Sequence, residues 1–408
     1  MRDSPGDKTD DRAGADIEHR GERTKAVRGG LNRSPFGETS EALFLNSGFV
    51  YPDGETAAAR FSGDDDGFVY SRYANPTVAV FEERLRLLEG AEACYATASG
   101  MAAVYGALAC QLNAGDHVVA SRALFGSCHQ IIANILPRFA IRSTLVDGTD
   151  LEAWRGAITA DTKCVFIETP SNPTLEAVDI EAVSAIAHSA GANVIIDNVF
   201  ATPVLQRPLE LGADIVVYSG TKHIDGQGRC LGGAVLSSTA FKEDLLKPFM
   251  RHTGPALSPF NAWVLLKGLE TLSLRVRAQS DAALDVARTL QSFEGVERVI
   301  YPFLDSHPQA ALCRKMMSAG GTVVSFEVAG GRQRAFDLLR QLSIIDISNN
   351  LGDAKSLITH PASTTHHAIG AEARERAGVR EGLVRLSVGL ESTADLIDDL
   401  DHAFRASG

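Results

Sequence analysis

The sequence predicts an α/β fold with a mostly parallel sheet, and three observations carry this prediction. Short apolar runs alternate with helical stretches between about residues 78 and 246. The apolar runs are continuous, which is typical of strands that are covered by helices on both faces. A long helical stretch follows them, and the rest of the chain holds further strands and helices, which indicates a smaller C-terminal α+β domain.

The elements follow from apolar spacing and from breaking residues, taken in chain order. Helices are expected at Val78–Leu88, Met101–Leu112, Ser127–Leu136, Ile180–Ala190 and Phe241–Leu246. Strands of the first sheet are expected at His117–Ala120, Cys164–Glu168, Val194–Asp197, Ile215–Ser219 and Ala234–Leu236. The long helical stretch covers about Asn261–Phe293, and later strands are expected at Val296–Tyr301, Thr322–Val328 and Leu383–Val388.

Composition divides the chain into four segments. Residues 1–27 are polar and charged with almost no large apolar residues, so we expect a disordered lead. Residues 28–75 have apolar patches but little periodicity, so we expect an arm that packs on a neighbouring subunit. The large domain is expected over 76–270 and the C-terminal domain over 271–408.

Charge and cysteine usage exclude several classes of function. The chain has 408 residues and a net charge of −12, which disfavours nucleic acid or an anionic membrane surface as a partner. No apolar stretch approaches the length of a membrane helix, and the N-terminus lacks the apolar core of a signal peptide. The six cysteines include no closely spaced pair, so we expect reduced thiols, a cytoplasmic location and no metal site.

The octapeptide Val216–His223 carries the strongest chemical signal. An apolar run ends in Ser219, Gly220 and Thr221, and Lys222 follows. Burial disfavours a charged amine, so a buried lysine has a lowered pKa and becomes a nucleophile. A lysine beside hydroxyls that can hold a phosphate is the chemistry needed to bind pyridoxal phosphate as a Schiff base. A strand end with a solvated lysine is the alternative.

Three more polar clusters follow apolar runs or open helices, where ligands of open α/β sheets bind. Ser99 and Gly100 open a helix whose free N–H groups favour a phosphate, although Ser is also an ordinary helix cap. Asp197 ends an apolar strand and could pair with a pyridinium nitrogen, or cap a helix. Asn172 lies between two prolines and could bond a cofactor oxygen, or simply form a rigid turn.

Two arginines offer receptors for anions. Arg72 stands between Tyr70 and Tyr73 in the arm, where it could hold a phosphate or lie in a surface turn. Its position in the arm means that a role in a distant pocket needs a second subunit. Arg385 lies in an alternating strand, where it could bind the carboxylate of an amino acid or form a structural salt bridge.

Together these motifs resemble the Cys/Met-metabolism family of pyridoxal-phosphate (PLP) enzymes. The matching segments are Tyr70–Thr77, Ala98–Ala103, Glu168–Pro173, Asp197–Asn198, Tyr218–Lys222 and Arg385–Glu391, in order within about residues 30–400. The resemblance implies PLP fold type I, which is aspartate aminotransferase-like, with a large cofactor domain and a smaller C-terminal α+β domain.

The resemblance also implies a role for each matching residue. Lys222 would bond the cofactor and carry protons, and Asp197 would pair with the ring nitrogen. Asn172 would lie near the ring hydroxyl, while Ser356 and Arg385 would bind the substrate carboxylate. The phosphate ligands would come from two subunits of a homotetramer built from dimers with shared active sites: Gly100, Met101, Ser219 and Thr221 from one, Tyr70 and Arg72 from its neighbour.

One departure from the family pattern narrows the expected reaction. Phe125 stands where the family usually has a tyrosine, so the ring can still stack on the cofactor but lacks the phenol as an acid or base. A carboxylate leaving group needs less acid help than a thiol, so the change favours replacement of succinate by sulfide over lyase chemistry.

The segments Leu124–Ser127, Arg251–Pro255 and Asp346–Asp353 resemble the O-succinylhomoserine sulfhydrylase branch of the family. The expected reaction is therefore a γ-replacement that yields homocysteine. Cystathionine γ-synthase, O-acetylhomoserine sulfhydrylase and methionine or cystathionine γ-lyase activities remain alternatives. An aminotransferase and a silent PLP-binding protein are the rivals of other classes.

Overall fold

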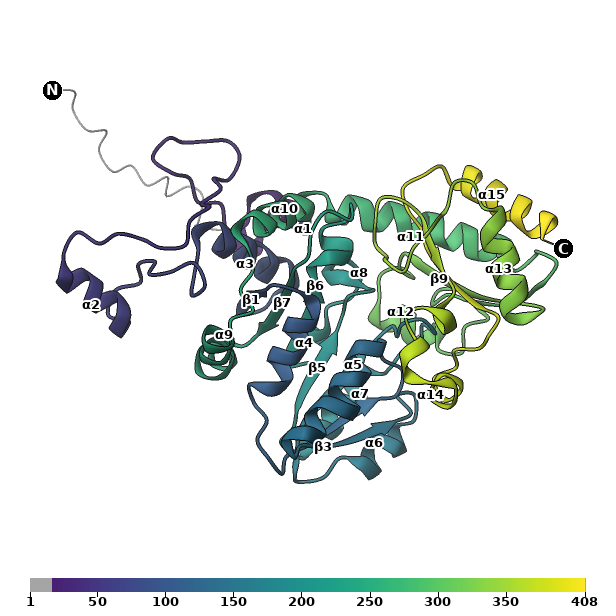
Figure 1. Ribbon diagram of the computed structural model, residues 1–408, viewed down its shortest axis with the longest axis horizontal. Helices are drawn as coiled ribbons and strands as arrows, with labels where there is room; N and C mark the ends of the chain where they lie inside the picture. Colours follow the sequence, from purple (N-terminus) through teal and green to yellow (C-terminus); the bar gives the residue numbers. More distant parts are fainter. Residues whose placement is uncertain (1–16, 408) are drawn as a thin grey trace.

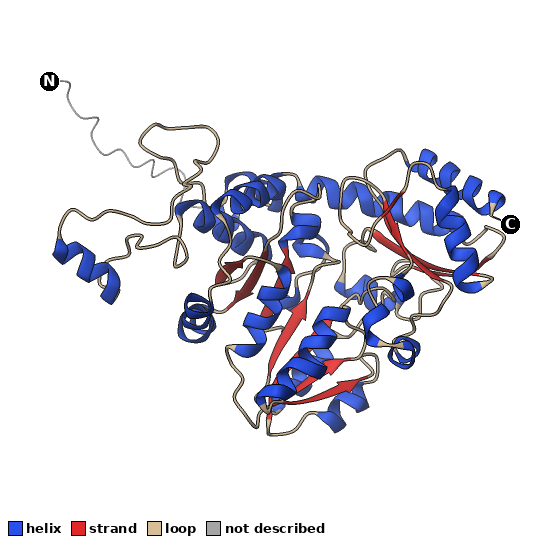
Figure 2. Ribbon diagram, viewed as in Figure 1, coloured by secondary structure: helices blue, strands red, loops and turns tan. Residues whose placement is uncertain are grey.

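The computed structural model describes residues 17–407, which form two sheets with helices around them (Figure 1). The larger sheet has seven strands in the order β1-β7-β6-β5-β4-β2-β3, and the smaller has five in the order β10-β11-β12-β9-β8. Helices cover both faces of the larger sheet in Figure 2, as the continuous apolar strands predicted. The predicted fold class is confirmed.

The strands of the larger sheet are β1 (Ala93–Thr97), β2 (His117–Ser121), β3 (Arg142–Val146), β4 (Thr162–Glu168), β5 (Asn193–Asp197), β6 (Ile215–Ser219) and β7 (Gly233–Ser237). Strands β2 to β6 pair in parallel, and β7 runs antiparallel to both β6 and β1. The parallel register sets Glu168 opposite Asp197 and Asp197 opposite Val217. The carboxyl ends of β4, β5 and β6 therefore lie side by side.

Strand β6 shows why the apolar runs are continuous. Val216 and Tyr218 belong to the hydrophobic cluster on one face of the sheet, whereas Ile215 and Val217 belong to the cluster on the other face. Each of these four side chains is at most 2% exposed. Burial of both faces fixes the position of the strand and delivers the segment that follows it, Gly220–Ile224, to the sheet edge.

The helices around the larger sheet are α3 (Pro76–Glu89), α4 (Gly100–Ala109), α5 (Gly126–Gln130), α6 (Leu151–Ala157), α7 (Ile180–Ser189), α8 (Thr202–Leu205), α9 (Lys247–Thr253) and α10 (Pro259–Glu270). Helix α5 continues as a π-helical segment, Ile131–Ile135, and another π-helical segment, Phe241–Leu246, precedes α9. The helix expected over Asn261–Phe293 is two helices, because the chain leaves helical geometry at Thr271 before α11 (Leu272–Leu290).

The smaller sheet contains β8 (Val296–Ile300), β9 (Val323–Val328), β10 (Asp346–Ile347), β11 (Leu357–Thr359) and β12 (Leu383–Ser387). It packs with α11 and with the C-terminal helices α13 (Gly331–Gln341) and α15 (Thr393–Ala406). Helices α12 (Ala310–Met316) and α14 (Ala371–Arg376) lie between its strands in the sequence. A separate hydrophobic cluster forms here, which agrees with the predicted second α+β unit.

The N-terminal part differs from the expectation of a disordered lead. Glu22–Arg28 forms helix α1, in which Ala26 is buried and Glu22 pairs with Arg277 of α11 at 3.3 Å. Composition missed this helix because its few apolar contacts are made with distant elements. Residues 1–16 of the expected lead lie outside the described part of the chain.

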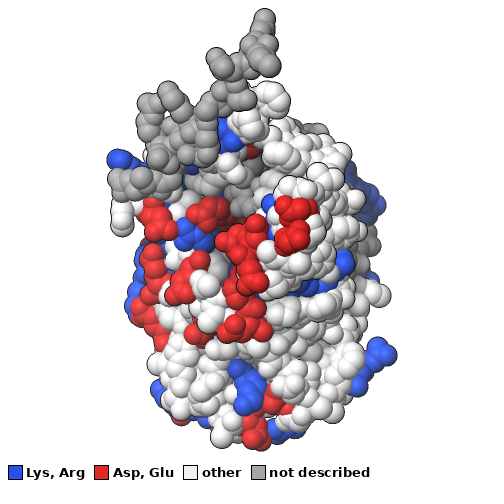
Figure 3. Space-filling model, turned by 90° about the vertical axis from the view of Figure 1, so that its left-hand side faces the viewer, with Lys and Arg blue, Asp and Glu red and all other residues white. Residues whose placement is uncertain are grey.

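The arm extends away from the sheets and carries helix α2 (Gly54–Ser62) (Figure 1). It exposes large apolar side chains: Phe36 is 95% exposed and Val50 is 93% exposed. Figure 3 shows acidic side chains gathered on the face at this end of the molecule, with basic groups among them. None of the helices in residues 17–407 has the length and apolar content to span a membrane.

Candidate active site

A cavity of about 230 Å³ opens at the carboxyl ends of β4, β5 and β6. It lies where the sheet rule places ligands. Its lining includes residues that the sequence analysis singled out in separate segments of the chain: Ser99, Gly100, Met101, Phe125, Asn172, Asp197, Ser219, Thr221, Lys222 and Arg385. The structure therefore brings together most of the predicted site residues.

One end of the cavity is built for an anion. Ser99 caps α4 by accepting a hydrogen bond from Ala102 N at 3.2 Å, so the helix begins at Gly100. A Cβ on Gly100 would lie 2.6 Å from the Cβ of Ser219, so only glycine allows the helix to approach the end of β6 this closely. Free N–H groups at the helix start and the Ser219 hydroxyl thus adjoin each other, which suits a phosphate.

Thr221 contributes differently from Ser219. Its hydroxyl donates to Gly232 O at 3.4 Å and accepts from Gly232 N at 3.2 Å. These contacts tie Gly220–Ile224 to the turn before β7. Thr221 still lines the cavity, so it can serve both the turn and a ligand.

Asp197 lies at the middle of the site and is 8% exposed. Its Oδ1 accepts from Val199 N at 3.2 Å. Burial raises the pKa of Asp197 to about 7, because the ionised carboxylate loses its hydration. A cationic pyridinium nitrogen would stabilise the charged form, which is the role that the sequence predicted for this residue.

Glu168 is a cavity residue to which the sequence argument gave no role. Burial raises the pKa of Glu168 well above its ordinary value, and the charge of Asp197 adds to the effect. Its carboxylate accepts from Phe125 N at 2.6 Å and from Asn172 N at 3.0 Å. Glu168 thereby fixes the two loops that carry these cavity residues.

Lys222 follows β6 with a non-helical backbone (φ −91°, ψ −124°) that breaks the segment Gly220–Ile224. Burial, and to a smaller extent the charge of Arg385, lower the pKa of Lys222 to about 8. The Nζ atom donates to Asn350 Oδ1 at 2.6 Å. Asn350 is therefore a second site residue without a role in the sequence argument, because the contact spans 128 residues.

Arg385 is buried on β12 and reaches the cavity from the smaller sheet. It donates through Nη1 to Asn172 Oδ1 at 3.0 Å and through Nη2 to the carbonyl oxygens of Asn349 at 2.9 Å and Asn350 at 3.1 Å. Its Nε is buried without a hydrogen-bond partner in the described chain. No carboxylate neutralises this guanidinium within ion-pair distance among those residues, which suits it to receive a substrate carboxylate.

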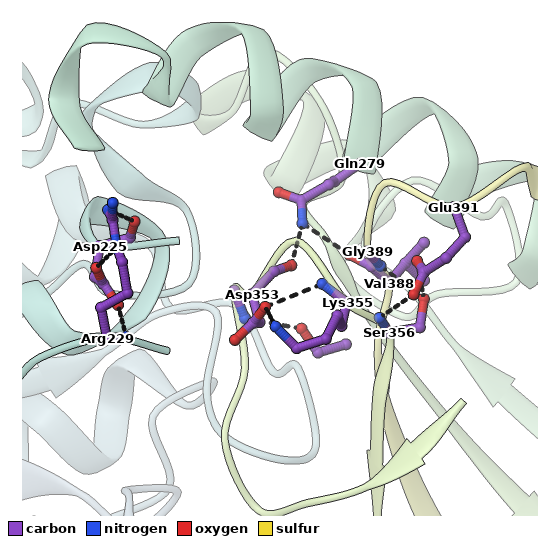
Figure 4. Close-up of polar contacts among 11 residues, drawn as sticks. Asp225, Arg229, Gln279, Asp353, Lys355, Ser356, Val388, Gly389 and Glu391 are labelled. Carbon is purple, nitrogen blue, oxygen red and sulfur yellow. Dashed lines mark hydrogen bonds and ion pairs between the residues drawn. The ribbon is translucent and has the colours of Figure 1, made fainter. Parts of the chain in front are cut away.

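Ser356 does not line the cavity with the other predicted residues. Its hydroxyl donates to Glu391 Oε2 at 2.8 Å and accepts from Gly389 N at 2.8 Å, and its own N–H donates to Glu391 Oε1 at 2.7 Å (Figure 4). These bonds join the start of β11 to the chain that follows β12. The residues that bond Arg385 instead lie in the loop between β10 and β11, at Asn349 and Asn350.

Tyr70 and Arg72 also lie outside the cavity lining of their own chain. Tyr70 is 42% exposed and pairs with Gly48 in the arm. Their part in a neighbouring subunit's site stays a prediction. All six cysteines are free thiols, and Cys128 lines the cavity with a pKa raised by burial.

The residues present fit pyridoxal phosphate. The N–H groups at the start of α4 and the Ser219 hydroxyl, which Gly100 allows to lie close together, would hold the phosphate. Asp197 would pair with the ring nitrogen, and the ring of Phe125 would stack on the cofactor ring. The amine of Lys222, with its lowered pKa, would be the nucleophile that a carbonyl cofactor requires.

Comparison with known proteins agrees with this geometry. Residues 23–405 match the family model described as "Cys/Met metabolism PLP-dependent enzyme". The chain is 56% identical over 386 residues to an O-succinylhomoserine sulfhydrylase of Mycobacterium tuberculosis, covering 93% of this chain and 95% of the relative. It is 47% identical to the protein of that name from Pseudomonas aeruginosa, covering 97% and 98% of the two chains. A solved structure of a putative O-acetylhomoserine (thiol)-lyase from Campylobacter jejuni, which contains a pyridoxyl-lysine monophosphate, superimposes with a TM-score of 0.91 at 33% identity, covering 95% and 100%.

Proposed function

The chain belongs to the Cys/Met-metabolism family of PLP-dependent enzymes, and within it we propose an O-succinylhomoserine sulfhydrylase. This transferase would replace the succinate of O-succinylhomoserine by sulfide and yield homocysteine. The reaction would serve methionine biosynthesis by direct sulfhydrylation. The observation that supports it most directly is 56% identity to a sulfhydrylase over nearly the whole chain, with Lys222, Asp197 and Arg385 together at one cavity.

Pyridoxal phosphate is the cofactor, and when bound it supplies an electron sink conjugated to the substrate Cα. Lys222 then removes the proton from Cα and moves protons at Cβ, for which an amine with a pKa of about 8 is suited near neutral pH. Arg385 binds the α-carboxylate and orients the substrate. The Cγ–O bond breaks with release of succinate, a C–S bond forms with hydrosulfide, and the Cα proton is returned.

Phe125 favours replacement over elimination. Its ring lines the cavity, and its backbone N–H is held by Glu168. It offers no phenol that could protonate a thiol leaving group, while succinate and hydrosulfide need no such help at neutral pH. Cystathionine γ-synthase, O-acetylhomoserine sulfhydrylase and γ-lyase activities are the alternatives within the family.

The arrangement of subunits is part of the proposal. We propose a homotetramer built from dimers, in which the arm carries Tyr70 and Arg72 into the neighbouring subunit's site to hold the cofactor phosphate. The exposed apolar residues of the arm support this, since Phe36, Leu45, Val50 and Phe61 are each at least 68% exposed. The free cysteines support a cytoplasmic location.

The function is tested by supplying the PLP-loaded enzyme with O-succinylhomoserine or O-acetylhomoserine, each with sulfide or with cysteine. The proposal expects homocysteine and succinate as the products of the highest kcat/KM. Cystathionine as the favoured product would indicate a cystathionine γ-synthase. Release of ammonia and a keto acid from methionine or cystathionine at a higher kcat/KM would indicate a γ-lyase.

A further inference from the structure

The end of α9 places a second arginine beside Arg72. Arg251 lies in the last turn of α9, in the segment Arg251–Pro255 that the cavity does not use. Its guanidinium carbon lies 4.3 Å from the ring centre of Tyr73, and that of Arg72 lies 4.8 Å from the same ring. Arg72 also lies over the ring of Tyr70, at 5.5 Å. Two cations therefore share one aromatic ring.

A hydrogen bond links the two arginines directly. Arg72 Nη1 donates to the carbonyl oxygen of Arg251, so the end of α9 holds the guanidinium of Arg72 in place. The Nε of Arg251 is buried and has no hydrogen-bond partner among the described residues. Among the ion pairs found within residues 17–407, none involves Arg72 or Arg251, and their cationic groups contact aromatic rings instead.

Two uncompensated guanidinium groups near one ring repel each other. Stacking on an aromatic face offsets part of this cost, and a bound anion offsets more. Paired arginines with open donors suit a phosphate, whose oxygens accept several charge-assisted hydrogen bonds at once. Tyr70, Arg72, Tyr73 and Arg251 therefore have the composition of an anion site that a neighbouring subunit would complete.

We propose that Arg251 is a positioning residue of the phosphate site that this subunit offers to its neighbour. It holds the Tyr73 ring and Arg72, and it adds a second positive charge behind the one that meets the cofactor phosphate. The inference rests on the shared active sites of the proposed function. It assigns to the Arg251–Pro255 segment a role in binding the cofactor rather than the substrate.

The test compares pyridoxal phosphate with pyridoxal, which lacks the phosphate. The full-length protein is stripped of cofactor, and the dissociation constants of both compounds are measured by absorbance for wild type, Arg251→Gln and Arg251→Lys. Because Arg251→Gln removes one charge-assisted contribution, it should raise the dissociation constant of pyridoxal phosphate about tenfold and leave that of pyridoxal unchanged. Arg251→Lys keeps the charge without the planar stack and should fall between.

A matched control lies on another helix. Arg155→Gln on α6 removes an exposed arginine charge that pairs with Glu152 and lines neither the cavity nor the hollow beside Arg72, so it should change neither constant. Equal weakening of both compounds by Arg251→Gln, or of neither, would overturn the proposal. A change only in the preference for succinyl over acetyl esters would assign Arg251 to the substrate instead and would also overturn it.

Two further measurements keep the outcome decisive. Sedimentation and thermal unfolding of each stripped protein check that the variants assemble and fold, and Tyr73→Leu serves as a second variant if Arg251→Gln does not. The ratio of the two dissociation constants is independent of which sulfur compound the enzyme uses. If the sulfhydrylase assay fails, the binding measurements therefore still decide whether Arg251 acts on the phosphate.

Discussion

A negative charge at position 350 would change the charge state of Lys222, and Asn350→Asp tests this. The substitution puts a carboxylate in place of an amide oxygen that lies 2.6 Å from the lysine Nζ. A unit charge about 4 Å from the amine interacts by about 4 kcal/mol at an effective permittivity of about 20, which is an upper limit because the new carboxylate is also desolvated. Opposite charges at such distances shift pKa values by about 1 to 3 units.

The sign follows from the protonation states. The pKa of Lys222 is lowered to about 8 by burial, so its neutral, proton-accepting form is available near neutral pH. A carboxylate at position 350 favours the protonated amine and raises that pKa. The acidic limb of the kcat–pH profile should therefore move to higher pH by about 1 to 3 units. The rate at which pyridoxal phosphate rejoins the stripped protein should shift in the same direction, since that step also needs the neutral amine.

Two controls separate charge from packing. Asn350→Ala removes the acceptor without adding a charge, so it should lower kcat but leave the acidic limb close to its position in wild type. Asn134→Asp adds the same charge at an exposed position and should change neither. The reasoning is refuted if Asn350→Asp leaves the limb unmoved, or if Asn134→Asp moves it equally.

Three further predictions concern other residues. Lys222→Ala should abolish turnover and the cofactor absorption band that depends on the lysine bond; a fully active variant would contradict its assigned role. Phe125→Tyr should raise elimination relative to replacement with O-succinylhomoserine, as measured by ammonia released per homocysteine formed. Asp399→Asn should lower the free energy of unfolding by about 1 to 3 kcal/mol in denaturant titration, because its carboxylate accepts four hydrogen bonds from Ser343, Ile344 and Ile345. Despite partial burial these bonds lower the pKa of Asp399, so the stabilisation is present above about pH 4 and should fade as the pH drops below it.

Five of the seven strands of the larger sheet were predictable because apolar residues fill both of their faces, but β1 was not predicted although it is buried along its whole length. Ile215–Ser219 was predicted with its observed bounds, since apolar residues fill both faces of β6. Strand β3 was missed because Arg142–Val146 is an edge strand that begins with three polar residues, so it forms no apolar run. Strand β11 has three residues, too few for a periodic signal. Short or edge strands are defined by their partners, and partners are not visible in a local pattern.

The site was predictable where residues follow a strand or open a helix. Lys222, Asp197 and Gly100 occupy such positions, and all three line the cavity. Ser356 was placed at the substrate carboxylate by resemblance alone, and the direction of its hydroxyl toward Glu391 depends on how β11 meets β12. Side-chain direction beside a short strand is set by the register of its pairing, which the sequence does not reveal.

Asn350 illustrates what joins the two parts of the site. Its side chain accepts from Lys222, and its backbone carbonyl accepts from Arg385, so one residue contacts both the proposed proton carrier and the proposed carboxylate receptor. A carboxylate there would pair with Lys222 and weaken the attraction of Arg385 for the substrate. A neutral acceptor orients the amine without raising its pKa as a carboxylate would, and it leaves the guanidinium charge for the substrate. A neutral amide at position 350 is therefore consistent with contacts to both the amine of Lys222 and the guanidinium of Arg385.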